Sequence, residues 1–253
     1  MRRRGLAMGT TVKYAARLDH VREVTLQGEA ELAFWGGRLR EHDMVPVEED
    51  GKAQILIIAA DAKFAGVRFR EVSVSVAVSR PEGAARKDAV FLVQAFNSSR
   101  FFAFCERAVF KTPYQHGRTR VSASYPPSIQ VRLGGEVVLQ AGMGLDPSGT
   151  AREPSRAGED GWEGPVFLPE GRRGSGQPGR LFFARIGGQT RVYPFREGHD
   201  TVTIRASPGG PTVFRDLVDS RFTGKTWIVR ENAEHAKSKT YRRADLFPGP
   251  ARA

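Results

Sequence analysis

The stretch VRFREVSVSVAVS at residues 67–79 alternates between two kinds of side chain and so constrains the fold more than any other segment. In an extended strand, Glu71, Ser73, Ser75 and Ala77 share one face, and a stripe of valines shares the other. Branched apolar residues outside and small polar residues inside are typical of a β-barrel wall around a cavity. The alternative is a sandwich strand with valines in the core and Glu71 in solvent. The alternation alone does not decide between these two structures.

A second segment, residues 89–121, predicts a strand, a helix and a polar strand in succession. Residues 90–95 form an apolar run of strand length, and Asn97 is suited to cap a helix over residues 98–110. Pro113 disfavours helical geometry in the residue before it, so the helix should end there. The apolar residues that recur at helical spacing, and that predict the packed face of this helix, are Phe101, Phe104, Cys105, Ala108 and Val109.

The helix exit carries more polar groups than a connection needs, and it is our candidate site. Tyr114, His116, Arg118 and Arg120 would share one face of a strand, and Gln115 would lie on the other. A histidine beside a carboxylate such as Glu71 can act as a general acid or base. Tyrosine and glutamine can hold an oxygen atom, and arginine can bind an acid. The alternative is a solvated strand face with no such role.

These segments resemble the acetoacetate decarboxylase-like superfamily over about residues 66–121. In that family an Asn/Asp-capped helix ends at a proline that is followed by two lysines, and an aromatic-x-Glu strand faces the same cavity. Here Phe69-Arg70-Glu71 matches the strand, and Pro113-Tyr114-Gln115-His116 stands in place of the lysine pair, as in an uncharacterised branch of the superfamily. The resemblance implies a mainly β (α+β) fold, an antiparallel β-barrel with one principal helix packed against it.

The departure from the lysine pair bears on the chemistry. Schiff-base decarboxylation requires an amine nucleophile, and neither Tyr114 nor Gln115 can form an imine. Lys111 lies three residues earlier, where a lysine often complements the carboxyl end of a helix. We therefore expect a pocket for a small organic or keto acid without Schiff-base decarboxylase activity. Glu71, Tyr114 and His116 are the predicted catalytic residues for non-imine lyase, hydratase or tautomerase chemistry, and the predicted substrate-binding residues are Gln115, Arg118, Arg120 and Lys111.

Two other functions stay open. A barrel of this kind could bind a small ligand without turning it over. The net charge of +11 is compatible with a nucleic-acid-associated protein. Its basic tail would contain Lys237, Lys239, Arg242 and Arg243. The basic residues are, however, spread along the chain rather than gathered on one stripe, so nucleic acid is a disfavoured partner. We interpret the tail as a solvated terminus.

Composition narrows the remaining classes. A hydrophobic content of 40% is sufficient for a core, and Cys105, the only cysteine, excludes an internal disulfide. The five histidines lack metal-ligand spacing, so we expect no metal and no cofactor. No apolar run is long enough to cross a membrane, so we expect a cytoplasmic protein without a membrane partner. Homo-oligomer formation is left open.

The predicted organisation is one domain over residues 13–243, between a flexible tail at 1–12 and a second tail at 244–253. Within the domain, residues 145–179 are rich in Gly, Pro, Ser, Glu and Arg. They predict a long irregular insertion loop.

Overall fold

The computed structural model describes residues 12–79, 89–146, 149–169 and 179–246. The predicted tail at 1–12 lies almost wholly outside the described residues, as does most of the tail at 244–253. In chain order the first elements are β1 (Tyr14–Glu31), α1 (Leu32–Arg40), β2 (Val45–Pro46), β3 (Glu48–Glu49), β4 (Lys52–Phe64), β5 (Val67–Ser79), β6 (Ala89–Asn97), α2 (Arg100–Cys105) and the π-helical turn η1 (Glu106–Phe110). They are followed by β7 (Tyr114–His116), β8 (Arg118–Ser122), β9 (Ser128–Leu133), β10 (Glu136–Gly142), β11 (Arg156–Leu168), β12 (Arg180–Pro194), β13 (Thr201–Ile204), α3 (Thr212–Asp219), β14 (Thr223–Ser238), β15 (Tyr241–Arg242) and α4 (Arg243–Leu246).

The main sheet has 11 strands, and seven of them pair in a closed cycle. The order β5-β4-β1-β14-β12-β11-β6 returns to its start because β6 also pairs with β5. Most of these pairs are antiparallel, but β6 pairs in parallel with both β11 and β7. The prediction of a mainly β fold is confirmed, and the prediction of a purely antiparallel sheet is wrong. The parallel pairs arise because β11 and β7 both reach β6 through crossover connections rather than hairpins.

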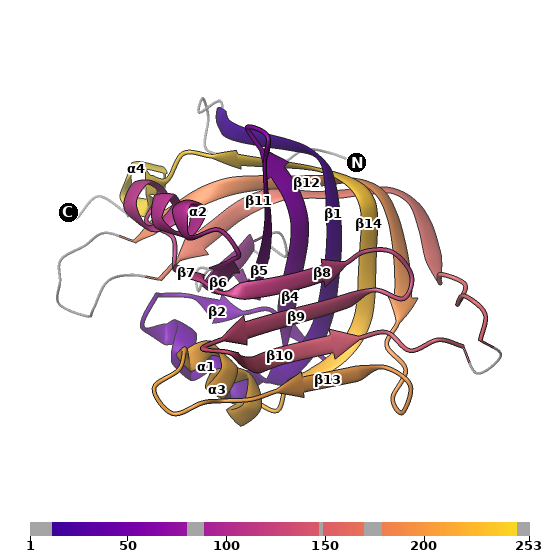
Figure 1. The fold of residues 1–253 in the computed structure, drawn as a ribbon. Coiled ribbons are helices and arrows are strands. Elements are labelled where there is room, and N and C mark those ends of the chain that lie inside the picture. Colours follow the sequence, from indigo (N-terminus) through magenta and orange to yellow (C-terminus); the bar gives the residue numbers. More distant parts are fainter. Residues whose placement is uncertain (1–11, 80–88, 147–148, 170–178, 247–253) are drawn as a thin grey trace.

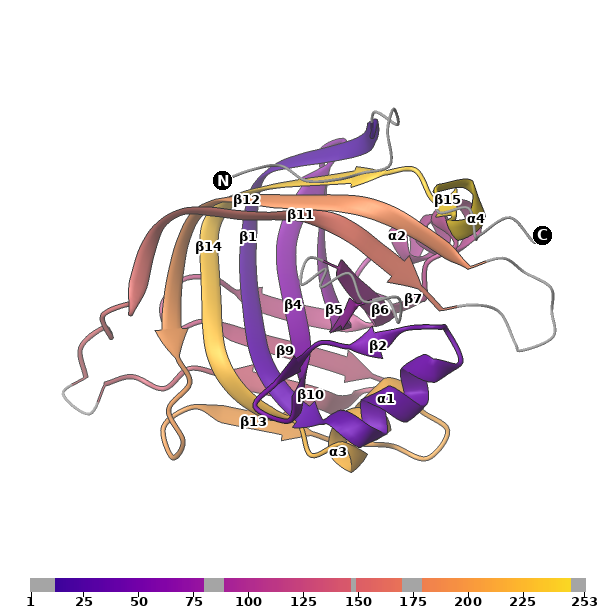
Figure 2. The same ribbon diagram turned by 180° about the vertical axis from the view of Figure 1, so that it is seen from behind.

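A second sheet, of order β13-β10-β9-β8, covers one face of the long strands (Figure 1). The largest apolar cluster lies between the two sheets. It joins the β5 valines to residues such as Ile129, Val131 and Leu139 of the second sheet, together with Trp35 of α1 and Phe214 of α3. This layer is the core of the protein, and the valine stripe belongs to it. On the opposite side, β11 and β12 arch over the strands and make the other face concave (Figure 2).

The alternation of β5 therefore sorts its side chains as the sequence predicts. Val72, Val74 and Val76 are fully buried in the core layer. Glu71 points to the concave face, and the register places Glu71, Ala60, Glu23 and Arg230 opposite one another across β5, β4, β1 and β14. Directly paired residues share a face of a sheet. One row of the concave face thus contains three charged side chains from three strands.

The helices differ from prediction in number. The helix predicted at residues 98–110 is present as α2 and η1, but α1 and α3 are of similar length, so the prediction of one principal helix is wrong. Both additional helices pack apolar side chains, Trp35 and Leu39 from α1 and Phe214 and Leu217 from α3, into the core layer.

The segment predicted as an irregular loop at residues 145–179 contains a long strand, β11. Its pairing with β12 runs without interruption from Arg156 to Leu168, although four of its residues are glycine or proline. Backbone pairing with β12 holds this segment extended, although its side chains show no strand pattern. The prediction of an irregular loop is therefore wrong for residues 156–168. Among the residues that the structure describes, no helix has the length and apolar character required to cross a membrane.

Candidate functional site

The α2–η1 helix brings polar groups to one end of the concave face. Its N-cap is Ser99 rather than Asn97: the Ser99 Oγ accepts from the Phe102 amide at 3.3 Å, and the Asn97 side chain accepts from the Ser99 amide. The helix widens into the π turn and ends at Lys111 with a φ of 58°. Thr112 Oγ1 then donates to Glu106 Oε2 at 2.7 Å. π turns often occur at functional sites, and here the turn directs Glu106 inward.

The first strand residue after Pro113 completes a contact with β5. Tyr114 is 8% exposed, and its hydroxyl donates to Glu71 Oε2 at 3.1 Å. Burial raises the pKa of the Glu71 carboxyl, and the Glu106 carboxylate adds to the rise, against the opposing effects of His235, Lys237 and the Tyr114 hydrogen bond. Burial also raises the pKa of Tyr114 well above its ordinary value, with further contributions from Glu71 and Glu106. Glu71 is thereby biased towards its protonated form.

Glu106 forms an ion pair with a lysine that lies next to Glu71 and Tyr114. Lys237 Nζ, from β14, donates to Glu106 Oε2 at 2.5 Å. The same nitrogen lies 4.5 Å from the ring centroids of Phe110 and Phe182 and 5.7 Å from that of Tyr114. The aromatic faces and the carboxylate both favour a positive charge at this position. A cation thus lies beside the Glu71–Tyr114 pair.

A second cluster surrounds Glu23 on β1, which is fully buried. Arg230 Nη1 donates to Glu23 Oε1 at 2.5 Å, His235 Nε2 lies 2.6 Å from Glu23 Oε2, and Arg230 Nε donates to Thr190 Oγ1 at 2.8 Å. Burial acts to raise the pKa of Glu23, but His235 and Arg230 outweigh it and hold this pKa below its ordinary value. The Glu23 carboxylate therefore fixes the orientation of the His235 ring.

The part of the concave face next to these clusters is not fully buried. Ser73, Ile58 and Ile228 occupy the neighbouring row of the same face, and each keeps part of its surface accessible to solvent. In contrast, the residues that alternate with them along the strands are buried in the core layer. The concave face thus offers charged groups at one end and an accessible wall of small and apolar side chains beside them.

The structure brings two of the predicted site residues together and leaves five outside. Glu71 and Tyr114 are hydrogen-bonded. The other five side chains are exposed, and within the described part of the chain none of them makes a hydrogen bond to Glu71 or Tyr114: His116, Gln115, Arg118, Arg120 and Lys111. Lys111 ends the helix, and Arg118 and Arg120 lie on β8 in the second sheet.

Four residues of the clusters are not indicated as site residues by any sequence pattern: Glu23, Glu106, His235 and Lys237. His235 and Lys237 are two residues apart on β14 and share its inner face, but the polar composition of their segment predicts a solvated tail. That interpretation is wrong for these two residues, which are partly buried. Lys237 is thus removed from the proposed basic tail. Residues 21–32 contain four charged side chains, and the sequence does not distinguish Glu23 from Arg22, Glu29 and Glu31.

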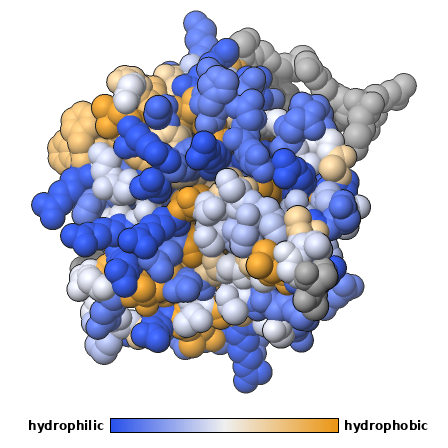
Figure 3. Space-filling view, turned by 45° about the vertical axis from the view of Figure 1, so that its right-hand side comes forward, coloured by the Kyte–Doolittle hydropathy of each residue, from blue (hydrophilic) through white to orange (hydrophobic). Residues whose placement is uncertain are grey.

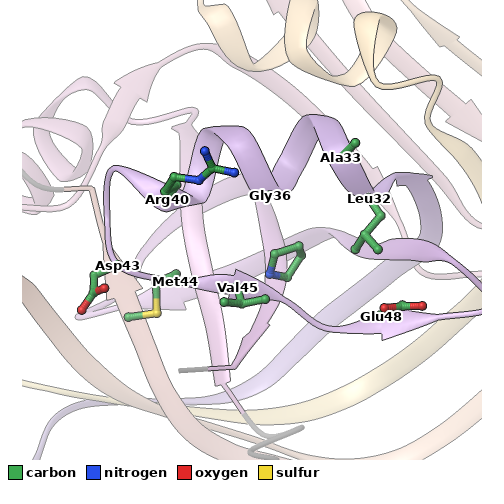
Figure 4. Close-up of a pocket in the computed structure, with 9 residues that line it drawn as sticks. Leu32, Ala33, Gly36, Arg40, Asp43, Met44, Val45 and Glu48 are labelled. Atoms are coloured by element: carbon green, nitrogen blue, oxygen red, sulfur yellow. The ribbon is translucent and has the colours of Figure 1, made fainter. Parts of the chain in front are cut away.

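A hollow of about 580 Å³ lies elsewhere, between α1 and β2 (Figure 4). It is lined by Leu32, Ala33, Gly36, Arg40, Asp43, Met44, Val45, Pro46 and Glu48, none of which belongs to the polar clusters. Size alone is a weaker criterion than convergent titratable groups with perturbed pKa values, so the concave face remains the candidate site. In the described ranges, no three His, Cys, Asp or Glu side chains are grouped so that they could hold a metal ion.

No family model and no curated protein sequence matches this chain. Solved structures do match its fold. Acetoacetate decarboxylase from Legionella pneumophila superposes with a TM-score of 0.58 at 12% identity, over 92% of this chain and 89% of that one. An acetoacetate decarboxylase-like enzyme from Sphingomonas wittichii gives 0.55 at 10% identity, over 91% and 94%. The enduracididine biosynthesis enzyme MppR in complex with pyruvate gives 0.56 at 11% identity, over 89% and 90%. At such identities the likeness establishes the fold, which is acetoacetate decarboxylase-like.

Proposed function

We propose, from the acetoacetate decarboxylase-like fold of this chain, that its concave face binds a small organic or keto acid. In this proposal the closed cycle of strands acts as a barrel, and the site lies on its inner wall. One observation carries the proposal: a carboxyl with a raised pKa, Glu71, lies beside a lysine cation, Lys237, on a face that solvent reaches. That MppR binds pyruvate on the same fold supports this class of ligand.

Each group has a role that follows from its chemistry. The Lys237 ammonium has three donors and uses one on Glu106, so it can also attract the carboxylate of an acid. Protonated Glu71 can donate to a carbonyl oxygen, and the Tyr114 hydroxyl orients it. His235, oriented by Glu23, can accept a proton from carbon or water. His235 would thus take the proton-transfer role that the sequence predicts for His116.

The proposed chemistry proceeds without an imine. Lys111 is exposed at the helix end, and the positions after Pro113 hold no amine. Lys237 is the one amine among the clustered groups, and its Nζ is held in an ion pair with the Glu106 carboxylate, not beside a second cation of the kind that activates imine-forming lysines. Proton transfer next to a carbonyl, as in hydratase, lyase or tautomerase reactions, is what the remaining groups can perform.

The test is calorimetric titration with a panel of α-keto and β-keto acids, followed by an assay for product. We expect at least one acid to bind, and we expect Tyr114→Phe and Lys237→Met to weaken its binding about tenfold or more, as for the loss of a hydrogen bond to a charged group. Arg118→Ala, an exposed position on β8, is the matched control and should bind normally.

Three outcomes would change the proposal. If no acid of the panel binds, the pocket is ruled out. If an acid binds without any product, the protein is a non-catalytic binding barrel. A stable adduct on a lysine after borohydride treatment, located by mass spectrometry, would restore imine chemistry, and we expect none.

A further inference from the structure

The outer face of the α2–η1 helix is apolar and has no partner within the described chain. Phe101, Phe104 and Val109, which the sequence predicted as the packed face, are 67%, 60% and 67% exposed. The inner face is formed instead by Phe102, Ala103, Glu106 and Phe110, so the helix is apolar on both sides. Large apolar side chains that gather on the exposed side of a helix mark a surface for contact with a partner or a membrane.

The turn between β4 and β5 extends this surface. Phe64 is 42% exposed and Val67 is 54% exposed. The ring of Phe102 joins the two segments, with centroids 6.2 Å from Phe64 and 5.6 Å from Phe101. We call Phe64, Val67, Phe101, Phe104 and Val109 the apolar patch. In Figure 3 apolar side chains gather at the upper left, over the end of the molecule that carries α2, with hydrophilic side chains beside them.

The exposed charges on the segments that carry the patch are positive. Lys63 adjoins Phe64, and Arg100, Arg107 and Lys111 lie on or next to the helix, all of them exposed. The one acidic residue of the helix, Glu106, points inward to Lys237. Lys239 is exposed one residue before Thr240, whose Oγ1 donates to the Phe110 carbonyl, so the segment that follows β14 adds a further cation near the end of the helix. The patch is thus an apolar centre with a cationic border.

We propose that this face docks onto an anionic lipid bilayer, with Phe101 and Phe104 entering the boundary between head groups and acyl chains. Exposed apolar side chains bordered by lysine and arginine are the pattern of surface-bound membrane helices. Anionic head groups attract the border, and the acyl boundary takes up the rings. This inference is independent of the proposed acid-binding site.

Two other occupants fit the patch less well than a bilayer, one because of charge and one because of side-chain shape. A second copy that met the first through the same face would place cations opposite cations. A single-stranded nucleic acid uses flat aromatic platforms for stacking, and Val67 and Val109 offer none. An anionic bilayer satisfies both the charge and the mixture of aromatic and aliphatic side chains.

The test is co-sedimentation of the full chain with lipid vesicles. We expect binding to vesicles that contain phosphatidylglycerol, little binding to phosphatidylcholine alone, and release at high salt. The double variant Phe101→Ser/Phe104→Ser should weaken vesicle binding about tenfold or more, since apolar burial and charge act together. Arg100→Glu/Arg107→Glu should weaken it by removing the charge attraction, which keeps the test informative if the first variant folds poorly.

Val218→Ser is the matched control, because Val218 is 46% exposed on α3, at the other end of the molecule from α2. Vesicle binding should be unchanged in this variant. The proposal is overturned if phosphatidylglycerol vesicles do not bind the protein, or if all three variants bind them equally. It is also overturned if the Phe101→Ser/Phe104→Ser variant instead abolishes a dimer seen by analytical ultracentrifugation, or the binding of a single-stranded oligonucleotide, while vesicles remain unbound.

Discussion

Lys237 Nζ donates to Glu106 Oε2 at 2.5 Å and so joins β14 to the π turn across 131 residues of sequence. Neither residue belongs to the motif that drew attention to the helix exit. Their ion pair places a cation within reach of Glu71 and Tyr114, where the sequence motif supplies none. The candidate site thus depends on a partner from the far end of the chain.

Replacement of this lysine should change the titration of Glu71. The Lys237 charge opposes the burial and the Glu106 charge that raise the pKa of Glu71, so Lys237→Met should raise that pKa further. The measurement is a carboxyl ¹³C NMR titration, with the Glu71 signal assigned by its loss in Glu71→Gln. Lys239→Met, in which an exposed lysine near the Tyr241 ring is lost, should leave the titration unaltered. Equal pKa values in both lysine variants would contradict the assigned role.

Glu71 should also make stability depend on pH. Its folded-state pKa lies above the ordinary 4.5, so the folded state binds more protons than the unfolded state at pH values just above 4.5. Stability should therefore fall as pH rises from 4.5 to the folded-state pKa, by up to about 1.4 kcal/mol per pH unit. Urea unfolding at several pH values should show this decline in the natural sequence and a flatter profile in Glu71→Gln. Parallel profiles would argue against a raised pKa.

Glu23 should have the opposite pH dependence and a larger effect on stability. Its pKa is held below the ordinary 4.5, so its stabilising contribution is present above pH 4.5 and is lost as pH falls through the lowered folded-state pKa. Glu23→Gln leaves the buried Arg230 without its carboxylate and should cost about 3–5 kcal/mol of unfolding free energy at neutral pH.

The matched control for Glu23 lies on the same strand. Glu29 pairs with Lys225 at 3.0 Å in a more exposed setting, and Glu29→Gln should cost only about 0–1 kcal/mol. Denaturant unfolding measures both variants. Similar losses in the two would show that the buried network contributes no more than a surface ion pair.

The β1–β14 pairing should tolerate no side chain at Gly28. A Cβ there would lie 2.1 Å from the Thr223 carbonyl oxygen and 2.5 Å from a Phe222 ring carbon. Gly28→Ala should therefore destabilise the protein by about 1–3 kcal/mol or more, as overpacking does. Gly37, in α1, has no atom within 4 Å of an added Cβ, and Gly37→Ala should stabilise by about 0.5–1 kcal/mol. Thermal unfolding of both variants gives the comparison, and an unchanged midpoint for Gly28→Ala would contradict the close approach.

The parts of the fold that follow from local pattern were predictable. The alternation at 67–79 produced β5 with its valines in the core, and the apolar run, cap and proline around residues 90–113 produced β6 and the helix. Strand β11 was not predictable in the same way, because its glycine- and glutamate-rich sequence lacks alternation and owes its extension to pairing with β12. The sequence predicts Phe101, Phe104 and Val109 on the packed side of the helix, but they lie on its exposed side. Both sides of the helix are apolar, so residue spacing alone cannot distinguish the packed side from the exposed one.

The sequence by itself determined which residues alternate, where the helix ends, and that the two positions directly after Pro113 hold no amine. The tertiary structure alone decided which side chains meet. Alternation assigns a side chain to a face of its strand, but the register between strands distant in sequence decides which faces and rows come together. The pairing of β1 with β14 brought His235 to Glu23 across 212 residues, and the wider arrangement of the strands brought Lys237 to Glu106 across 131. No local pattern encodes those meetings, because they depend on the packing of the whole cycle of strands.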